Sequence, residues 1–388
     1  MWGVMKRRWR PLAFGVALFC TLAFVITEFV YYFPLTPISL DIHGETELPA
    51  PRGVLRLVYV GDIKLADTAA DAIHDHGYAY IFRGTRRVLQ GAHLAIGNLE
   101  GPITARGVPN PHKRWSYKVP PAAAKGLAQA GFDLMNLANN HIQDCGDVGI
   151  SESVKHLRAA GIVPFGGGLT RREAHRPAIS EIQGVKIANL GYIPPQMRYR
   201  GKKISLRSLA WSRRRGGGGW GGDRELKRDI HRARQVADVV VVSFHMGDRY
   251  QKMPLPFERD LCHRAIDFGA DVVVGHGTHI MGPIEVYQGK PIFYSVGNFA
   301  FGSLNVRARF GLMAVVDVGV ASKGVEAVHA LPIYTVNGNP WVRHQTKILV
   351  GTQALKVLSM LSQRSKTLGT RVLMQRRPTR GYISLLEP

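Results

Sequence analysis

Cysteine is scarce in this sequence, which has three in 388 residues. Disulfide-dependent secreted scaffolds carry many more, so this chain has to be held together by a hydrophobic core. Cys20 lies in an apolar N-terminal run, which leaves Cys145 and Cys262 as the two that could pair in an oxidising compartment. Nothing in the sequence requires that bridge, and we expect two unpaired core residues.

Acidic residues are also few: 28 Asp and Glu stand against 51 Lys and Arg, a formal net charge of +23. Such an excess attracts polyanions, which include nucleic acid, anionic lipid headgroups and acidic polymers. The sequence has no RNP motif, no zinc-finger spacing and no leucine zipper, so we do not expect a nucleic-acid partner. Its 45% hydrophobic and 20% charged residues are typical of a globular chain and exclude general disorder.

One long apolar run stands near the N-terminus, Pro11–Phe33, after four basic residues between Lys6 and Arg10. It is about long enough for a helix to cross a ~30 Å hydrocarbon core, and it lacks a clear small-x-small cleavage site. We therefore predict that residues 1–33 form a basic cytoplasmic tip and an uncleaved single-pass anchor in the plasma (inner) membrane. Because basic flanks stay inside, the rest of the chain is expected outside the cytoplasm.

Beyond this run, helical segments alternate with apolar strands that end in polar residues, which is the rhythm of an α/β fold. Residues 34–53 are rich in proline and acidic side chains and are predicted to form a stalk. A main domain is expected at 54–340, and a C-terminal helix with a basic tail at 341–388. The predicted strands include Val54–Asp62, His93–Gly97, Leu134–Leu137, Val185–Ile193 and valine-rich segments that end at His245 and His276.

The segment Trp211–Glu225, "WSRRRGGGGWGGDRE", has a run of three consecutive arginines and six glycines. This composition predicts a flexible loop without a packed conformation. Two interpretations remain open: a tolerated surface insertion, which we favour, and a mobile basic flap over an anionic substrate.

Five predicted strand ends carry polar side chains that a buried strand does not need. In open α/β sheets, ligands bind beyond the carboxyl ends of the strands, so these side chains are expected to converge on one site. They are Asp62, Glu100, Asn140 with His141, His245, and His276 with His279.

Carboxylates, a carboxamide and imidazoles form a mixed oxygen and nitrogen ligand set. This set suits Mn²⁺, Zn²⁺ or Fe²⁺ and argues against a cysteine-based site. A carboxylate able to bridge, with ligands on both sides, indicates two ions, the arrangement used for in-line displacement at phosphorus. One histidine left over would be free to protonate a leaving group.

The order of these motifs resembles the calcineurin-like metallophosphoesterases, and their particular form resembles the bacterial CapA family of capsule biosynthesis, associated with poly-γ-glutamate synthesis. The resemblance covers about Leu55 to Phe301 and implies an α/β fold, a four-layer α/β/β/α sandwich. The matching segments are "VGDIKL", "GNLEGPIT", "NLANNHIQDCGDVGI", "VVSFHMGDRY" and "GADVVVGHGTHIMGPIEVYQGKPIFYSVGNFAF".

The resemblance also implies a role for each polar residue. The first ion would be held by Asp62 and His279, the second by Asn140, His245 and His276, with Glu100 bridging the two and His141 as general acid. Other polar residues of the same motifs would orient ligands, contact substrate or only pack, namely Lys64, Asn98, Asp144, Asp248, Tyr250, Ser295 and Asn298.

Two positions depart from the phosphoesterase pattern. The first loop usually carries Asp-x-His, and here it is Asp62-Ile63-Lys64. Without that imidazole the first ion binds weakly, or only one ion binds, or Lys64 supplies a fixed positive charge instead. The bridging carboxylate is Glu100 where aspartate is usual. Both changes resemble the CapA form of the motifs.

Two functions are consistent with the sequence. The first is a metal-dependent hydrolase or transferase that acts on an anionic cell-surface polymer or its carrier. The second is a non-catalytic scaffold that helps to assemble, export or anchor an acidic capsule polymer. Either function implies the membrane, a polymer such as poly-γ-glutamate and other capsule-synthesis membrane proteins as partners.

Overall fold

The computed structural model describes residues 39–66, 69–199, 202–213, 215–376 and 379–385. The predicted membrane anchor and Cys20 lie outside these residues. Within the described part of the chain, no helix is both long enough and apolar enough to cross a membrane. Cys145 and Cys262 are buried and unpaired, as the sequence predicts.

The larger of two main sheets has ten strands within the described residues, and parallel and antiparallel pairings both occur in it. Its strand order is β19-β20-β17-β16-β1-β2-β3-β4, with β15 beside β1 and β18 beside β17. The bounds are β1 Val54–Ile63, β2 Leu94–Leu99, β3 Leu134–Asn136, β4 Val163–Phe165, β15 Asn298–Ala300, β16 Phe310–Gly319, β17 Val325–Tyr334, β18 Lys347–Ile348, β19 Leu373–Arg376 and β20 Thr379–Ser384.

The second sheet has six strands in the order β13-β14-β12-β11-β7-β6. Their bounds are β6 Ala178–Ile182, β7 Val185–Tyr192, β11 Val239–His245, β12 Val272–His276, β13 Ile284–Tyr287 and β14 Lys290–Phe293. Two small ribbons lie outside both sheets, β5 Gly167–Gly168 with β10 Gly217–Gly218, and β8 Gln196–Tyr199 with β9 Lys202–Ser205.

Helices connect most of the parallel strands. The α-helices are α2 Ala70–His76, α3 Arg86–Gln90, α4 Ala122–Ala130, α5 Gly146–Ala159, α6 Arg171–Ala174, α7 Asp223–Arg234, α8 Pro256–Asp267 and α9 Gly351–Lys366. Single 3₁₀ turns occur at η2 Tyr78–Phe82, η3 Arg207–Leu209 and η4 Val306–Ala308.

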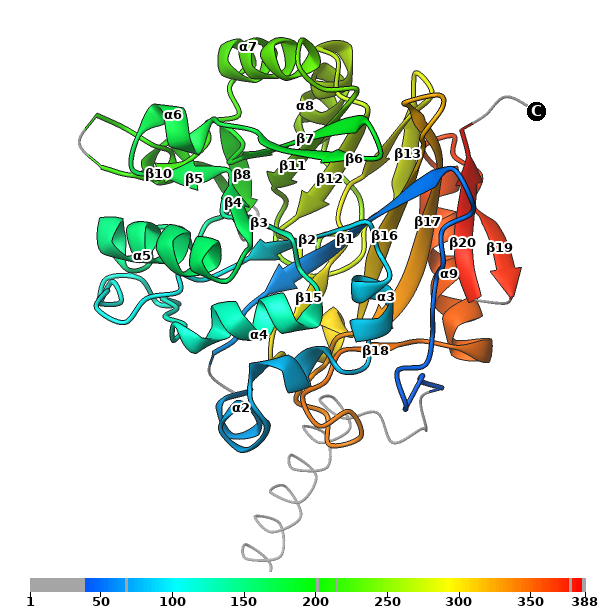
Figure 1. Ribbon diagram of the computed structural model, residues 1–388, viewed down its shortest axis with the longest axis horizontal. Helices are drawn as coiled ribbons and strands as arrows, with labels where there is room; N and C mark the ends of the chain where they lie inside the picture. The colour runs from blue at the N-terminus through cyan, green and yellow to red at the C-terminus, as the bar shows by residue number, and fades with distance from the viewer. Residues whose placement is uncertain (1–38, 67–68, 200–201, 214, 377–378, 386–388) are drawn as a thin grey trace, which may run out of the picture.

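The two sheets pack face to face, and the alternation of side chains along each strand shows it. In β1, Leu57 belongs to a core shared by both sheets, whereas Val58 belongs to a core with α3, α4 and α5. In β11, Val241 joins the shared core and Val240 packs with α7 and α8. Successive side chains of a strand point to opposite faces, so four layers result: helices, ten-stranded sheet, six-stranded sheet, helices (Figure 1). The predicted four-layer arrangement is present.

Segments at both ends of the described chain pack against the two-sheet domain. Leu40 forms an isolated bridge with Leu349, and Leu48, in the predicted stalk, is buried. Helix α9 places Val357 and Leu361 in the core between the sheets, and β20 pairs with β17. The described parts of the predicted stalk and of the C-terminal segment therefore pack on the main domain.

The prediction of an unpacked glycine-rich loop is wrong. Gly217 and Gly218 form β10, pair with Gly168 and Gly167 of β5, and are buried. A Cβ at Gly217 would lie 2.6 Å from the carbonyl oxygen of Leu209, closer than packed atoms approach. The glycines therefore serve close backbone approach, which composition alone does not distinguish from flexibility.

Candidate metal centre

The predicted ligands lie at the carboxyl ends of strands from both sheets. In the ten-stranded sheet Asp62 of β1 is the register partner of Asn98 in β2. In the six-stranded sheet His245 and His276 are the last residues of β11 and β12 and are register partners. Because the sheets pack face to face, the two sets of strand ends meet.

Two glycines allow the segment after β14 to approach these ends. A Cβ at Gly61 would lie 1.8 Å from the Gly297 carbonyl oxygen, and one at Gly275 would lie 2.1 Å from that of Tyr294. Any side chain at either position would push this segment away from Asp62 and His276. The glycines preceding the ligands are thus part of how the site closes.

Asp62 is surrounded by the three predicted imidazole ligands. Its Oδ1 lies 3.9 Å from His245 Nδ1 and 3.7 Å from His276 Nδ1, and its Oδ2 lies 3.4 Å from His279 Nδ1. Ligand atoms of Asp62, Glu100 and His245 all lie within 4.8 Å of one another. This carboxylate-imidazole group is compact enough to hold a metal ion.

The hydrogen bonding of the cluster fits a bound cation. Five buried polar atoms of the predicted ligand set have no hydrogen-bond partner among the described residues: Asp62 Oδ2, Glu100 Oε1 and Oε2, Asn140 Oδ1 and His276 Nδ1. Buried polar groups in folded proteins are nearly always satisfied, and an unpaired buried carboxylate is costly. Unpaired oxygen and nitrogen atoms of Asp62, Glu100 and His276, which belong to one cluster, are therefore what a metal ion requires.

The two carboxylates in the cluster are pushed apart in pKa. Burial opposes the charge on Asp62, but His279, His245 and His276 around it hold its pKa below the usual range. Burial, and next the charge of Asp62, raise the pKa of Glu100 to about 8. A cation between these carboxylates would remove the repulsion that keeps Glu100 protonated.

Two imidazoles of the cluster also differ in pKa, one lying below the usual value for histidine and the other above it. Burial lowers the pKa of His245 to about 3. Burial also opposes the charge on His279, but Glu100 and Asp62 overcome it and raise its pKa to about 9. His279 has a backbone φ of 62°, a left-handed conformation that is uncommon outside glycine and clusters at functional sites.

Asparagines orient the cluster. Asn98 Nδ2 donates to Asp62 Oδ1 at 2.8 Å and lies 3.2 Å from His245 Nδ1. Its Oδ1 accepts from Asn136 Nδ2 at 3.1 Å. Asn298 Oδ1 lies 2.9 Å from His279 Nδ1. Such partners fix the direction in which a ligand presents its lone pair.

His141, the predicted general acid, lies beside the cluster. Its Nε2 is 3.4 Å from Glu100 Oε1, and its Nδ1 is 2.6 Å from Asp144 Oδ2. The Tyr117 ring stacks on it with centroids 4.1 Å apart. Lys113 Nζ bonds to Asp144 at 2.5 Å and approaches His141 Nδ1 at 3.3 Å. Burial lowers the pKa of His141 to about 4, and Asp144 only partly offsets this.

The other predicted residues hold the surrounding segments. Lys64 Nζ lies 4.7 Å from the Tyr117 ring centroid, which places its charge beside His141. Asn305 donates to the Tyr250 hydroxyl at 2.9 Å. Ser295 accepts from Thr278 and from a backbone N–H, and Asp248 accepts from the backbone of the next residue.

Sequence reasoning missed several residues of this site. Asn136 and Asn139, which both bond to Asn98, lie in a recognised motif but have no ligand chemistry of their own. Lys113 and Tyr117 come from an irregular connection between β2 and α4, where no periodicity marks them. The only available signal was the mixture of basic and aromatic residues there.

Comparison with known proteins shows that most of this chain matches a single protein family. Residues 56–303 match the family described as "Bacterial capsule synthesis protein PGA_cap". The capsule biosynthesis protein CapA of Bacillus anthracis is 28% identical over 74% of this chain and 69% of its own length. The PGA biosynthesis protein CapA of Bacillus subtilis is 29% identical over 75% of each chain.

Solved structures with this arrangement are more distant. A phosphatase from Mycoplasma pneumoniae is 15% identical, with a TM-score of 0.45 over 75% of this chain and 97% of its own. A hypothetical protein from Thermus thermophilus is 16% identical, with a TM-score of 0.44 over 72% of this chain and 100% of its own. Likeness at this level carries no functional information.

Proposed function

This chain belongs to the PGA_cap family of bacterial capsule synthesis proteins, and we propose that it is a metal-dependent hydrolase or transferase acting on an anionic cell-surface polymer of the poly-γ-glutamate type, or on the carrier of that polymer. One observation carries the enzymatic part of the proposal. Five buried atoms of the predicted ligand set lack hydrogen-bond partners among the described residues, and those of Asp62, Glu100 and His276 lie at or next to strand ends. The polymer is supported by two Bacillus relatives, a capsule biosynthesis protein and a PGA biosynthesis protein.

The residues divide between two ions as the family motifs imply. Asp62 and His279 would hold the first, Asn140, His245 and His276 the second, and Glu100 would contact both. The ligand atoms suit Mn²⁺, Zn²⁺ or Fe²⁺. When bound, such ions stabilise negative charge on attacking and leaving oxygens. Lys64 stands where a further histidine is usual, so the first ion would have fewer protein ligands.

The chain's own residues would handle the proton. Asp144 accepts from His141 Nδ1, which fixes the tautomer and presents Nε2 toward Glu100. Because burial lowers the pKa of His141, the imidazole is neutral at pH 7 in the free protein. An anionic substrate beside Nε2 favours the protonated form, and that proton then passes to the leaving group. Lys113 holds Asp144 in place for this role.

We also propose that Pro11–Phe33 anchors the protein in the membrane with the metal centre outside the cytoplasm. The apolar run and its basic flank support this topology. Other membrane proteins of capsule synthesis would be neighbours there. A reporter fused after Pro388 should then be active only outside the cytoplasm.

The deciding experiment measures bound metal by elemental analysis and hydrolysis of phosphodiester and γ-glutamyl substrates on the same preparation. The wild type, supplied with Mn²⁺ or Zn²⁺, should hold stoichiometric metal. His141→Ala should keep that metal and lose roughly 10²–10⁴-fold in rate, the usual contribution of a general acid. His74→Ala, at an exposed histidine of α2, is the matched control and should change neither. If the wild type held no stoichiometric metal, the proposed enzymatic function would be contradicted. The non-catalytic scaffold would then be the remaining function.

A further inference from the structure

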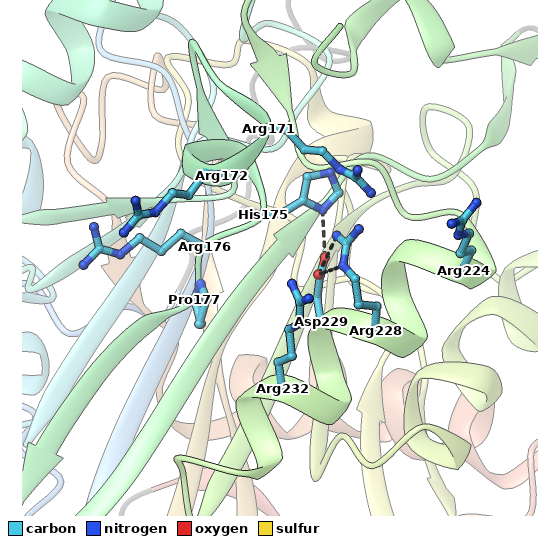
Figure 2. A pocket seen from close by; sticks show the side chains of 9 residues that line it. All are labelled: Arg171, Arg172, His175, Arg176, Pro177, Arg224, Arg228, Asp229 and Arg232. Atoms are coloured by element: carbon cyan, nitrogen blue, oxygen red, sulfur yellow. Dashed lines mark hydrogen bonds and ion pairs between the residues drawn. The ribbon is translucent and has the colours of Figure 1, made fainter. Parts of the chain in front are cut away.

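A second charged region lies away from the metal centre, on α6, the segment after it and α7. A cavity of about 690 Å³ there is lined by six arginines and contains none of the predicted metal ligands. Figure 2 shows their side chains arranged around a central ion pair between His175 and Asp229. The arginines are Arg171, Arg172, Arg176, Arg224, Arg228 and Arg232.

The cavity continues on both sides. A neighbouring cavity of about 740 Å³ shares Arg172 and Arg176 with it and adds Arg158 of α5. A third, of about 220 Å³, shares Arg171 and Arg224 and adds Arg207. The eight arginines that line the three cavities define what we call the arginine groove. Because the groove runs through three cavities that share lining residues, it offers more contacts to an extended chain than to a single ion.

Most of the positive charge in the arginine groove is uncompensated within the described residues. Asp229 is already bonded to His175 at 2.8 Å, to Arg228 Nη2 at 2.6 Å and to the Tyr192 hydroxyl at 3.2 Å. Two other carboxylates, Glu173 and Glu225, also line the groove. The first caps α6, and the second lies 3.7 Å from Arg171. Only Arg171 and Arg228 among the eight pair with a carboxylate of the described chain. The other six arginine side chains have no hydrogen bond or ion pair within the described residues: Arg158, Arg172, Arg176, Arg207, Arg224 and Arg232.

The residue type indicates the ligand chemistry. All eight cations of the groove are arginine and none is lysine. The planar guanidinium binds carboxylate or phosphate oxygens with two parallel hydrogen bonds, which an ammonium cannot do. Crowding exposed like charges costs stability, and a bound anion would offset that cost. The groove is thus suited to a repeated oxyanion.

The spacing of the arginines on α7 also matches an acidic polymer. Arg224, Arg228 and Arg232 recur every fourth residue, which is ~6 Å along a helix with 1.5 Å rise. An α-linked residue spans ~3.3–3.6 Å over three backbone bonds, so a γ-linked glutamate with five bonds spans ~6 Å. The repeat length of an extended γ-linked chain therefore matches the spacing of the row of arginines.

We propose that the arginine groove binds an extended polycarboxylate chain, the polymer substrate itself, at a position separate from the metal centre. The choice of a polycarboxylate over other polyanions rests on the proposed function. In this role the groove holds a long chain while another part of it, or its carrier, reaches the metal ligands. Binding should therefore require many linked carboxylates and should not depend on bound metal.

The test compares two triple variants of the full-length protein that lose the same charge. The groove variant is Arg172→Gln with Arg224→Gln and Arg232→Gln. The control variant is Arg52→Gln with Arg371→Gln and Arg376→Gln, three exposed arginines outside the groove. Fluorescent poly-γ-glutamate should bind the groove variant about tenfold or more weakly, since each charged hydrogen bond contributes strongly. The control should stay within about twofold, because screened surface charge contributes little.

Equal weakening in both variants would overturn the proposal, because net charge alone would then explain binding. Tighter binding of polyphosphate, an oligodeoxynucleotide or anionic vesicles than of poly-γ-glutamate would overturn the polycarboxylate assignment. Monomeric glutamate should not compete at the same carboxylate concentration. Metal content is measured in parallel. Polymer binding through the arginines without any metal would sink the enzyme proposal alone, and metal with unchanged polymer binding would sink the groove alone.

Discussion

The metal centre and the arginine groove are both charged, and they are built in opposite ways. At the metal centre, carboxylates and imidazoles from strand ends are buried, with Asp62 and Glu100 fully inaccessible to solvent. In the groove, positively charged arginines line an exposed surface formed largely by helices. Burial makes each unpaired atom costly in the first region, whereas water and salt screen the charges of the second. Substitution is therefore expected to change metal binding strongly in the first region, and to change the stability of the fold only slightly in the second.

The largest effect is expected when a buried metal ligand is removed. His245→Ala should abolish bound metal, because the second ion keeps the larger ligand set and depends on this imidazole. His279→Ala should leave about half of the metal, since it removes a ligand from the ion that already lacks one. Losses around a metal site are typically ~10–100-fold even for residues that only orient ligands. Elemental analysis of each variant measures the effect, and full metal in His245→Ala would contradict the ligand assignment.

A buried ion pair outside both regions tests how strongly burial affects the contribution of a charged group to stability. Arg56 binds Asp317 with two bonds of 2.8 and 2.7 Å, and His329 Nε2 lies 2.8 Å from the same carboxylate. Burial raises the pKa of Asp317, but His329 and Arg56 outweigh it and lower the pKa to about 2. The unfolded value is ~3.9, so the stabilisation is complete above ~4 and is lost as pH falls toward about 2.

Asp317→Asn should therefore lower the free energy of unfolding at pH 7 by about 3 kcal/mol, as for one broken buried pair. The difference from wild type should shrink between pH 4 and about 2, as measured by urea unfolding at each pH. Glu47→Gln breaks the exposed pair with Arg87 at 2.8 Å and is the control, expected to cost less than about 1 kcal/mol. A pH-independent difference for Asp317→Asn would show that lost packing, not charge, is responsible.

The smallest effect on the stability of the fold is expected for the groove variant, Arg172→Gln with Arg224→Gln and Arg232→Gln. Arg224 and Arg232 flank Arg228 at four-residue spacing on α7, and like charges at that spacing destabilise a helix by about 0.2–0.5 kcal/mol per pair. Replacing them with glutamine should leave the unfolding temperature unchanged or slightly higher. Differential scanning calorimetry at low and physiological salt measures this. A clear loss of stability would mean that the arginines are structural, and the comparison between the two regions would fail.

The sequence identified most residues of the candidate metal centre because their side chains sit at strand ends, where apolar runs stop at polar residues. Asp62, Glu100, Asn140, His245 and His276 were all singled out this way, and the family resemblance then implied a role for each. The α/β class followed from the same alternation of strands and helices, whereas the four-layer arrangement was an expectation from the family resemblance. These features depend on local pattern, and local pattern is what a sequence displays.

Only the tertiary structure decided the rest. It brought Lys113 and Tyr117 onto His141 from a connection without periodicity, and it turned the glycine run at 216–219 into a packed ribbon. It also gathered arginines from positions 158 to 232 into one groove. In each case the deciding contact joins residues far apart in the chain. Composition could not show whether glycine gave flexibility or close approach, nor whether arginines were scattered or adjacent, because both depend on which segments pack together.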